Sequence, residues 1–215
     1  MIHGAGDSGW YWHLVASELR EKGHEVVAPD LPIEDDSAGL AEYTETVVEA
    51  VGGRTELVVA AQSAGAFVAP LVCERLPVDM VVLVAGLVPA PGETGNDWWT
   101  NTGWAPVHGE WSGDEVAIFY HDVPPELTAE ARRHARAQSD TPAVEPWPLA
   151  AWPEVPTRFI LCREDRLLPA DFLRRVVRER LSIEPDEIDA GHCVALSRPT
   201  ELAERLDAYR AQATR

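Results

Sequence analysis

The stretch VVAAQSAGAF, residues 58–67, changes character half-way along its length. Its first half is an apolar, β-branched run that predicts a strand, and its second half resumes as apolar residues at helical spacing. A strand that passes directly into a helix needs a tight turn, with small residues where the two elements crowd together. Ala61 and Gly65 supply small residues on either side of Ser63, which is the small-x-Ser-x-small pattern of a nucleophile elbow. The pattern makes Ser63 a candidate nucleophile if the rest of the chain supplies its partners.

Outward from this stretch, short apolar runs alternate with amphipathic segments, which predicts a parallel sheet with crossover helices. We expect strands at 24–29, 56–61, 79–86 and 157–162, and a weaker one at 186–190. We expect helices at 10–23, 40–51, 124–138 and 199–213. The chain has 215 residues, 46% of them hydrophobic, which is enough for one substantial core. We therefore predict a single α/β domain over residues 1–215.

A serine nucleophile needs a base within hydrogen-bond reach and an acid that orients the base. The predicted strand at 157–162 ends in REDRLLP, which puts Asp165 just past its end, and the next strand ends in AGHC, which puts His192 just past its own. Glu164 and Asp189 are competing acids, but Glu164 lies one residue nearer its strand and Asp189 only three positions before the histidine. Ser63, Asp165 and His192 are the predicted catalytic residues.

The oxyanion of an acyl-transfer intermediate needs two backbone N–H donors. One comes from the residue after the nucleophile, here Ala64. The chain opens with the Gly-rich turn MIHGAGDSGW, residues 1–10, whose Ala5 supplies the natural second donor. We expect His3 of this turn to be a structural hydrogen-bonding residue.

The chain resembles the plant methylesterase and hydroxynitrile lyase branch of the α/β-hydrolase superfamily, together with its bacterial esterase relatives. The resemblance rests on IHGAGDSGWYWHLVASELREKGHEVVAPDLP, AQSAG, CREDRLLP and AGHCVALSRPTELAE, which occur in the family's order. It implies the α/β-hydrolase fold, a mostly parallel sheet flanked by helices, with Ser63, Asp165 and His192 as the triad and Ala5 and Ala64 as the oxyanion hole. The family carries a full strand before the first loop, so we expect an abbreviated N-terminal strand here.

Two positions separate the esterases from the lyases of this branch. The lyases resemble one another in carrying Thr directly after the first-loop histidine and Lys directly after the catalytic histidine, where this chain has Gly4 and Cys193. A lyase needs a cation to accept the charge of cyanide, and a thiol supplies none. The sequence therefore favours an esterase.

Residues 88–152 interrupt the alternation and predict a cap or lid inserted into the domain. They hold six of the eight tryptophans: Trp98, Trp99, Trp104, Trp111, Trp147 and Trp152. These form a small core of the cap or line an apolar pocket. His121 and Asp122 either touch the substrate or form a helix-capping turn. Outside the cap, the candidate pocket residues are Gly4, Trp10, Trp12 and Cys193.

The amino-acid composition limits the classes of molecule that we expect this protein to bind. The formal net charge of −18 argues against nucleic acid and anionic membranes, and we attribute it to solubility. Three widely spaced cysteines predict reduced thiols in the cytoplasm, and no motif predicts a metal site or a cofactor. The sequence predicts a serine hydrolase that cleaves a small carboxylic ester through an acyl-enzyme. The alternatives are a ligand-binding or receptor-type protein on the same scaffold and a C–C bond hydrolase with the same triad.

Overall fold

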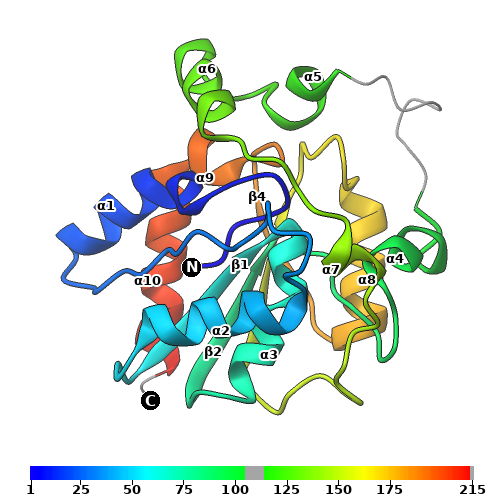
Figure 1. The fold of residues 1–215 in the computed structure, drawn as a ribbon. Helices are drawn as coiled ribbons and strands as arrows, with labels where there is room; N and C mark the ends of the chain where they lie inside the picture. Colours follow the sequence, from blue (N-terminus) through cyan, green and yellow to red (C-terminus); the bar gives the residue numbers. More distant parts are fainter. Residues whose placement is uncertain (105–113, 214–215) are drawn as a thin grey trace.

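The computed structural model describes residues 1–104 and 114–213, and its centre is a parallel sheet (Figure 1). The strands lie in the order β1 (Leu57–Gln62), β2 (Val78–Val84), β3 (Thr157–Cys162) and β4 (Asp186–Ile188). Neighbouring strands pair in parallel throughout, for example Leu83 of β2 opposite Phe159 of β3. Because parallel strands end at the same edge of a sheet, the turns that follow them gather there.

Helices flank both faces of this sheet (Figure 1). In chain order they are η1 (Gly9–Trp12), α1 (His13–Glu21), α2 (Leu40–Val51), η2 (Ser63–Phe67), α3 (Ala69–Cys73), α4 (Gly95–Asn101), α5 (Glu115–Phe119), α6 (Pro125–His134), α7 (Thr141–Val144), α8 (Ala170–Leu181), α9 (Val194–Ser197) and α10 (Pro199–Ala213). The α/β-hydrolase architecture expected from the sequence is therefore present.

The period-two alternation of the strands divides the buried side chains into two cores. In β2, Val81 and Leu83 pack into the core beneath α2, α3 and α8, whereas Val82 and Val84 pack into the core beneath α1, α9 and α10. The strands are buried on both faces, which explains why they appear in the sequence as continuous apolar runs. Burial of a large aliphatic side chain contributes about 1.5–3 kcal/mol, so these two layers hold the carboxyl edge of the sheet rigid.

The N-terminal strand is reduced to a single parallel bridge between Ile2 and Ala61. The expected strand at 24–29 is wrong, because residues 24–30 adopt no regular secondary structure. Within the described residues, a single hydrogen bond joins residues 1–3 to residues 24–30, from the Met1 amino group to the carbonyl oxygen of Val27, at 2.6 Å. One such bond does not make the repeating ladder of a strand pair.

The segment at 88–152 carries α4, α5, α6 and α7 between β2 and β3. In Figure 1, α5 and α6 lie beyond one end of the sheet, away from the helices that cover its faces. The helix expected at 124–138 is shorter than predicted, because the backbone turns extended at Ala135. Trp111 lies outside the described residues, and the assignment of 88–152 as a cap stays a prediction.

Candidate active site

Ser63 occupies the turn that directly follows β1. Its backbone φ angle is +49°, in the left-handed region that residues other than glycine rarely adopt. A Cβ on Gly65 would lie 2.7 Å from the carbonyl oxygen of His3 and 3.1 Å from Cγ2 of Ile2, so only glycine fits there. Backbone strain of this kind costs on the order of 1–3 kcal/mol and clusters at functional sites. The small residues around Ser63 thus permit the close approach of the N-terminal segment to this turn.

Asp165 and His192 form a buried pair in the turns that follow β3 and β4. Nδ1 of His192 lies 2.7 Å from Oδ2 of Asp165, and both residues are 4% exposed. The second oxygen, Oδ1, accepts hydrogen bonds from the N–H groups of Leu167 and Leu168, at 2.8 and 2.9 Å. The carboxylate therefore has a fixed orientation, and its bond to Nδ1 leaves Nε2 of the imidazole for another partner.

The competing acids do not contact His192. The Glu164 side chain is exposed, and Asp189 pairs with Arg163 at the surface. Among the acids weighed from the sequence, Asp165 alone makes the hydrogen bond that orients the imidazole.

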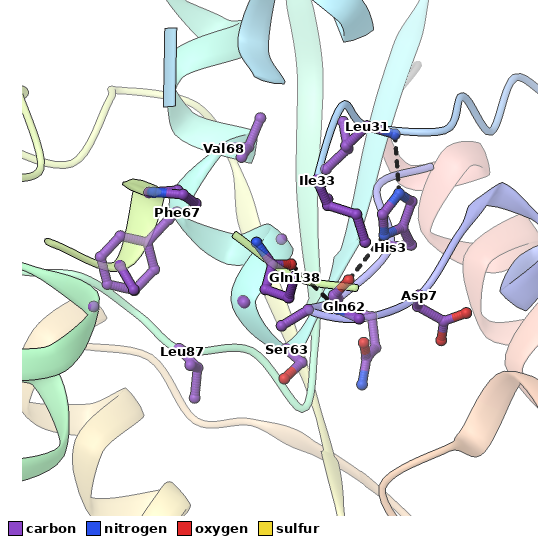
Figure 2. Close-up of a pocket in the computed structure, with 18 of the residues that line it drawn as sticks. His3, Asp7, Leu31, Ile33, Gln62, Ser63, Phe67, Val68, Leu87 and Gln138 are labelled. Carbon is purple, nitrogen blue, oxygen red and sulfur yellow. Dashed lines mark hydrogen bonds between the residues drawn. The ribbon is translucent and has the colours of Figure 1, made fainter. Parts of the chain in front are cut away.

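Ser63 and His192 line one cavity of about 780 Å³. Figure 2 shows Ser63 in the wall of this cavity. Its walls are largely apolar, with Ile33, Phe67 and Leu87 among the contributing side chains. Within the described residues, no hydrogen bond joins the Ser63 hydroxyl to His192. Such bonds are often long before a substrate binds and shorten in the complex. The volume lies in the range of pockets that enclose small organic molecules.

The first loop is held from both sides. Nε2 of His3 accepts a hydrogen bond from the N–H of Leu31 at 3.0 Å, so its Nδ1 carries the proton that is donated to the carbonyl oxygen of Gly4 (Figure 2). Burial lowers the pKa of His3, consistent with the neutral, structural histidine predicted from the sequence. On the other side, Gly6 accepts from the N–H of Arg136 and donates to Oε1 of Gln138. Ala5, between these anchors, lines the cavity, as does Ala64 after Ser63.

Gly4 and Cys193 line the cavity, as expected. A Cβ on Gly4 would lie 2.2 Å from Oε1 of Gln62 and 3.1 Å from Cβ of Ser63, so a threonine here would require the Gln62 side chain to move. Burial raises the pKa of the Cys193 thiol well above its ordinary value, which keeps the group neutral. Neither position offers the groups that the lyases have there.

Trp10 and Trp12 do not line this cavity, so their prediction as pocket residues is wrong. Trp12 is fully buried in the core beneath α1 and α10. The Trp10 ring stacks against His13 and His134, with ring centroids 4.2 and 4.4 Å apart. The helical period that begins in η1 turns both rings away from the first loop.

The described tryptophans of 88–152 divide between the cavity wall and the main core of the domain, so the predicted separate core of the cap is wrong. Trp99 and Trp104 line the cavity, whereas Trp98 and Trp147 are buried in the core and donate their indole N–H groups to backbone carbonyl oxygens. Trp152 donates to the hydroxyl of Thr157 at the start of β3 and packs at the margin of the same core.

His121 and Asp122 connect the segment after α5 to both loops of the Asp165–His192 pair. His121 Nε2 lies 2.9 Å from the carbonyl oxygen of Glu164, next to Asp165. Oδ2 of Asp122 accepts from the N–H of Gly191, next to His192, at 2.8 Å. A Cβ on Gly191 would lie only 2.5 Å from Oδ1 of Asp122. The sequence did not decide the role of these two residues, because a hydrogen bond to a distant backbone group has no sequence motif.

We expect Asp122→Ala to lower kcat for ester hydrolysis about three- to tenfold with little change in KM. The substitution leaves the Gly191 N–H without its acceptor and loosens the backbone that positions His192, at a cost of about 1 kcal/mol in stability. Asp122→Asn keeps an acceptor and should restore most of kcat. Steady-state kinetics on a short aryl ester measure both values. An unchanged kcat in Asp122→Ala would show that the contact does not position the histidine.

Among residues 1–104 and 114–213, no helix combines the length and the apolar character needed to cross a membrane. Over the same ranges, no cluster of histidine, cysteine and carboxylate side chains has the arrangement of a metal site.

The sequence matches the alpha/beta hydrolase family over residues 1–205. The chain belongs to this family. A comparison with curated proteins finds no match. The family match over residues 1–205 confirms the predicted superfamily and fold.

Solved structures similar to this hydrolase-family chain share its fold at low sequence identity. A pyrethroid hydrolase from Sphingobium faniae JZ-2 has a TM-score of 0.81 and 23% identity, with 98% of this chain and 95% of the other covered. Polyneuridine aldehyde esterase has a TM-score of 0.81 and 20% identity, with 97% of each chain covered. An extracellular α/β-hydrolase from a Paenibacillus species has a TM-score of 0.79 and 18% identity, with 96% of each chain covered.

Proposed function

We propose that this hydrolase-family protein is a serine esterase that cleaves carboxylic esters through an acyl-enzyme. The observation that carries the proposal is the strained turn at Ser63, which opens into the same cavity as a histidine held by a buried carboxylate. A hydroxyl needs such a base to become a nucleophile, and the base needs a fixed orientation. The esterase and hydrolase names of the structural neighbours support the same reaction class.

In the proposed reaction, Nε2 of His192 takes the hydroxyl proton as Oγ of Ser63 attacks the ester carbonyl carbon. The N–H groups of Ala5 and Ala64 donate to the resulting oxyanion. The C–O bond to the alcohol then breaks, and the imidazolium returns its proton to the departing oxygen. Water, deprotonated by the same imidazole, attacks the acyl-enzyme, and the carboxylic acid leaves with Ser63 regenerated. Asp165 stays ionised and stabilises the imidazolium at each step.

The cavity volume widens the expected substrate range from small esters to larger ones. About 780 Å³ with walls that include Phe67, Trp99 and Trp104 encloses an ester of drug size as well as a short one. Gly4 and the neutral Cys193 favour hydrolysis over cyanohydrin cleavage, because neither stabilises a departing cyanide anion.

A panel of 4-nitrophenyl esters with acyl chains of two to twelve carbons tests the proposal. We expect hydrolysis across the panel, with kcat/KM rising from acetyl to the medium chains as apolar area is buried in the cavity. Absence of turnover of every ester in a folded sample would contradict the proposal. Cyanide release from mandelonitrile that depends on Ser63 would instead indicate a lyase.

A further inference from the structure

Asp7 is a carboxylate in the wall of the candidate active site with no role in the reaction proposed above. It lies on the first loop, four residues after His3, and lines the same cavity as Ser63 and His192 (Figure 2). Its side chain is partly buried, and its Oδ1 accepts a hydrogen bond from the N–H of Ser8 at 2.9 Å. Among residues 1–104 and 114–213, no Lys or Arg pairs with it and no donor meets its second oxygen.

Partial burial without a cationic partner disfavours the charged form of the Asp7 carboxylate. Burial raises the pKa of Asp7 from 3.8 to about 6, against the opposing effects of the Ser8 N–H and the charge of His192. Strongly perturbed carboxylates in a cleft are candidates for function. A bound cation would supply the missing partner and favour the ionised form.

The side chains around Asp7 suit an organic cation. Phe119 and Tyr120, at the end of α5, line the cavity beside His192, and the Phe119 ring lies edge-on to the imidazole with centroids 5.4 Å apart. Burial is the main cause that raises the pKa of Tyr120. The negative charge of Asp7 raises it further, together with Cys193 and Glu115. Aromatic rings that share a cavity with a carboxylate are groups that bind alkylammonium ions.

The remaining charged side chains of the cavity are more exposed than Asp7 or already paired, and solvent screens an exposed charge. Glu115 and Asp140 are exposed acids that line the same cavity. Arg136, which also lines it, is already engaged by Glu34 at 3.0 Å and by the carbonyl oxygen of Leu31 at 2.8 Å. Arg132 on α6 is exposed and lowers the pKa of Tyr120 only slightly. The Tyr11 hydroxyl is buried, and the charge of Asp7 is one of the causes that raise its pKa. The net charge of −18 adds long-range attraction for cations.

We propose that Asp7, with Phe119 and Tyr120, forms a subsite for a positively charged ammonium group, and that the enzyme prefers esters carrying one over neutral esters of the same shape. The inference rests on the proposed esterase activity and goes beyond it by naming the substrate class. Asp7 acts here as a specificity-determining residue that contacts the substrate.

The test compares two esters that differ only in charge. Butyrylthiocholine carries a quaternary ammonium, and S-(3,3-dimethylbutyl) thiobutyrate replaces its nitrogen by carbon. We expect kcat/KM of wild type to favour the cation about tenfold or more, which is about 1.4 kcal/mol. Asp7→Asn should bring the ratio of the two kcat/KM values close to one, because the substitution removes the charge that distinguishes the two esters. Asp36→Asn removes the same charge at an exposed site outside the cavity and should leave the ratio unchanged.

Salt and pH give two independent readouts. Raising the salt concentration should lower kcat/KM for the cationic ester only. Because the pKa of Asp7 is raised to about 6, its charge is present above that pH and lost below it. The preference should therefore be full at pH 8 and should fall as the pH drops through 6, whereas in Asp7→Asn the ratio should not change with pH.

A binding measurement keeps the inference testable apart from turnover. Phenyltrimethylammonium should quench the fluorescence of Trp99 and Trp104 in the cavity, with an affinity about tenfold lower in Asp7→Asn. Hydrolysis of the neutral ester without any preference for the cation, or equal loss of both activities in Asp7→Asn, would overturn the subsite and leave the esterase proposal standing. Turnover of neither ester would count against the esterase, and the binding result would then decide the subsite alone.

Discussion

Replacing Ser63 by alanine should lower kcat for ester hydrolysis by roughly 10⁴-fold or more, the scale observed when a member of a catalytic triad is removed. The substitution deletes the attacking oxygen and leaves the turn intact, since serine and alanine carry the same Cβ at the left-handed φ of +49°. The thermal midpoint should therefore remain close to that of wild type. Steady-state kinetics on a 4-nitrophenyl ester, read alongside a melting curve, measure both effects.

Ser63→Gly provides a matched control for this turn. It also removes the oxygen, but glycine adopts a positive φ without strain, so the variant should be as inactive as the alanine variant and more stable. Retention of more than a tenth of wild-type activity in either variant would place the nucleophile elsewhere. An inactive but unfolded Ser63→Ala would be recognised from the melting curve, and Ser63→Gly would then carry the comparison.

Asp165→Asn should lower kcat by about 10²- to 10⁴-fold without unfolding the protein. The reason lies in the two backbone N–H groups of Leu167 and Leu168, which both donate to Oδ1. The amide oxygen of asparagine must occupy that position, because an NH₂ group there would face two donors. The NH₂ group then points at Nδ1 of His192 and stabilises the tautomer whose Nε2 carries the proton. In that form the imidazole cannot accept a proton from Ser63.

Glu164→Gln is the matched control for the acid. The Glu164 side chain is exposed and only its backbone carbonyl oxygen meets His121, so the variant should stay within about twofold of wild-type kcat. The two variants make the same isosteric change at adjacent positions. A large loss in Glu164→Gln together with a small one in Asp165→Asn would reverse the assignment of the acid.

Much of the sheet could be predicted from the sequence because its strands are buried on both faces. Apolar runs such as TRFILC stand out from their surroundings, and β3 has the predicted bounds of 157–162. The segment at 24–29 also has a β-branched apolar centre, yet it forms no strand. A strand needs a neighbour to pair with, and this segment meets residues 1–3 through a single hydrogen bond among the described residues.

The site was predictable where residue type and position along a strand agree. Asp165 and His192 each follow a strand end, and the parallel sheet brings these ends together, so their hydrogen bond follows from topology. Trp10 and Trp12 lie close to the first loop in sequence, but the turn of η1 and α1 directs their rings elsewhere. Closeness to the loop in sequence therefore does not predict which side chains line the cavity when a helix begins between them.

The contacts of Asp7 and Asp122 illustrate what the sequence alone does not contain. Asp7 stands in a Gly-rich turn where an aspartate is an ordinary turn residue, and only the fold places it in the wall of the cavity that His192 also lines. Asp122 reaches the N–H of Gly191, 69 residues further along the chain. The contact of Asp122 depends on how the segment at 88–152 packs, and the turns between its short helices have no periodicity from which packing can be predicted.

Covalent labelling by a fluorophosphonate, followed by intact-mass measurement and peptide mapping, tests most directly whether Ser63 is an activated nucleophile. The reagent forms a stable phosphonyl adduct only with a serine whose hydroxyl is activated by a neighbouring base. We predict one adduct per chain on the peptide that contains Ser63, none in Ser63→Ala, and much slower labelling in Asp165→Asn. A folded wild-type protein that takes up no adduct, or takes it up on another residue, would contradict the role assigned to Ser63.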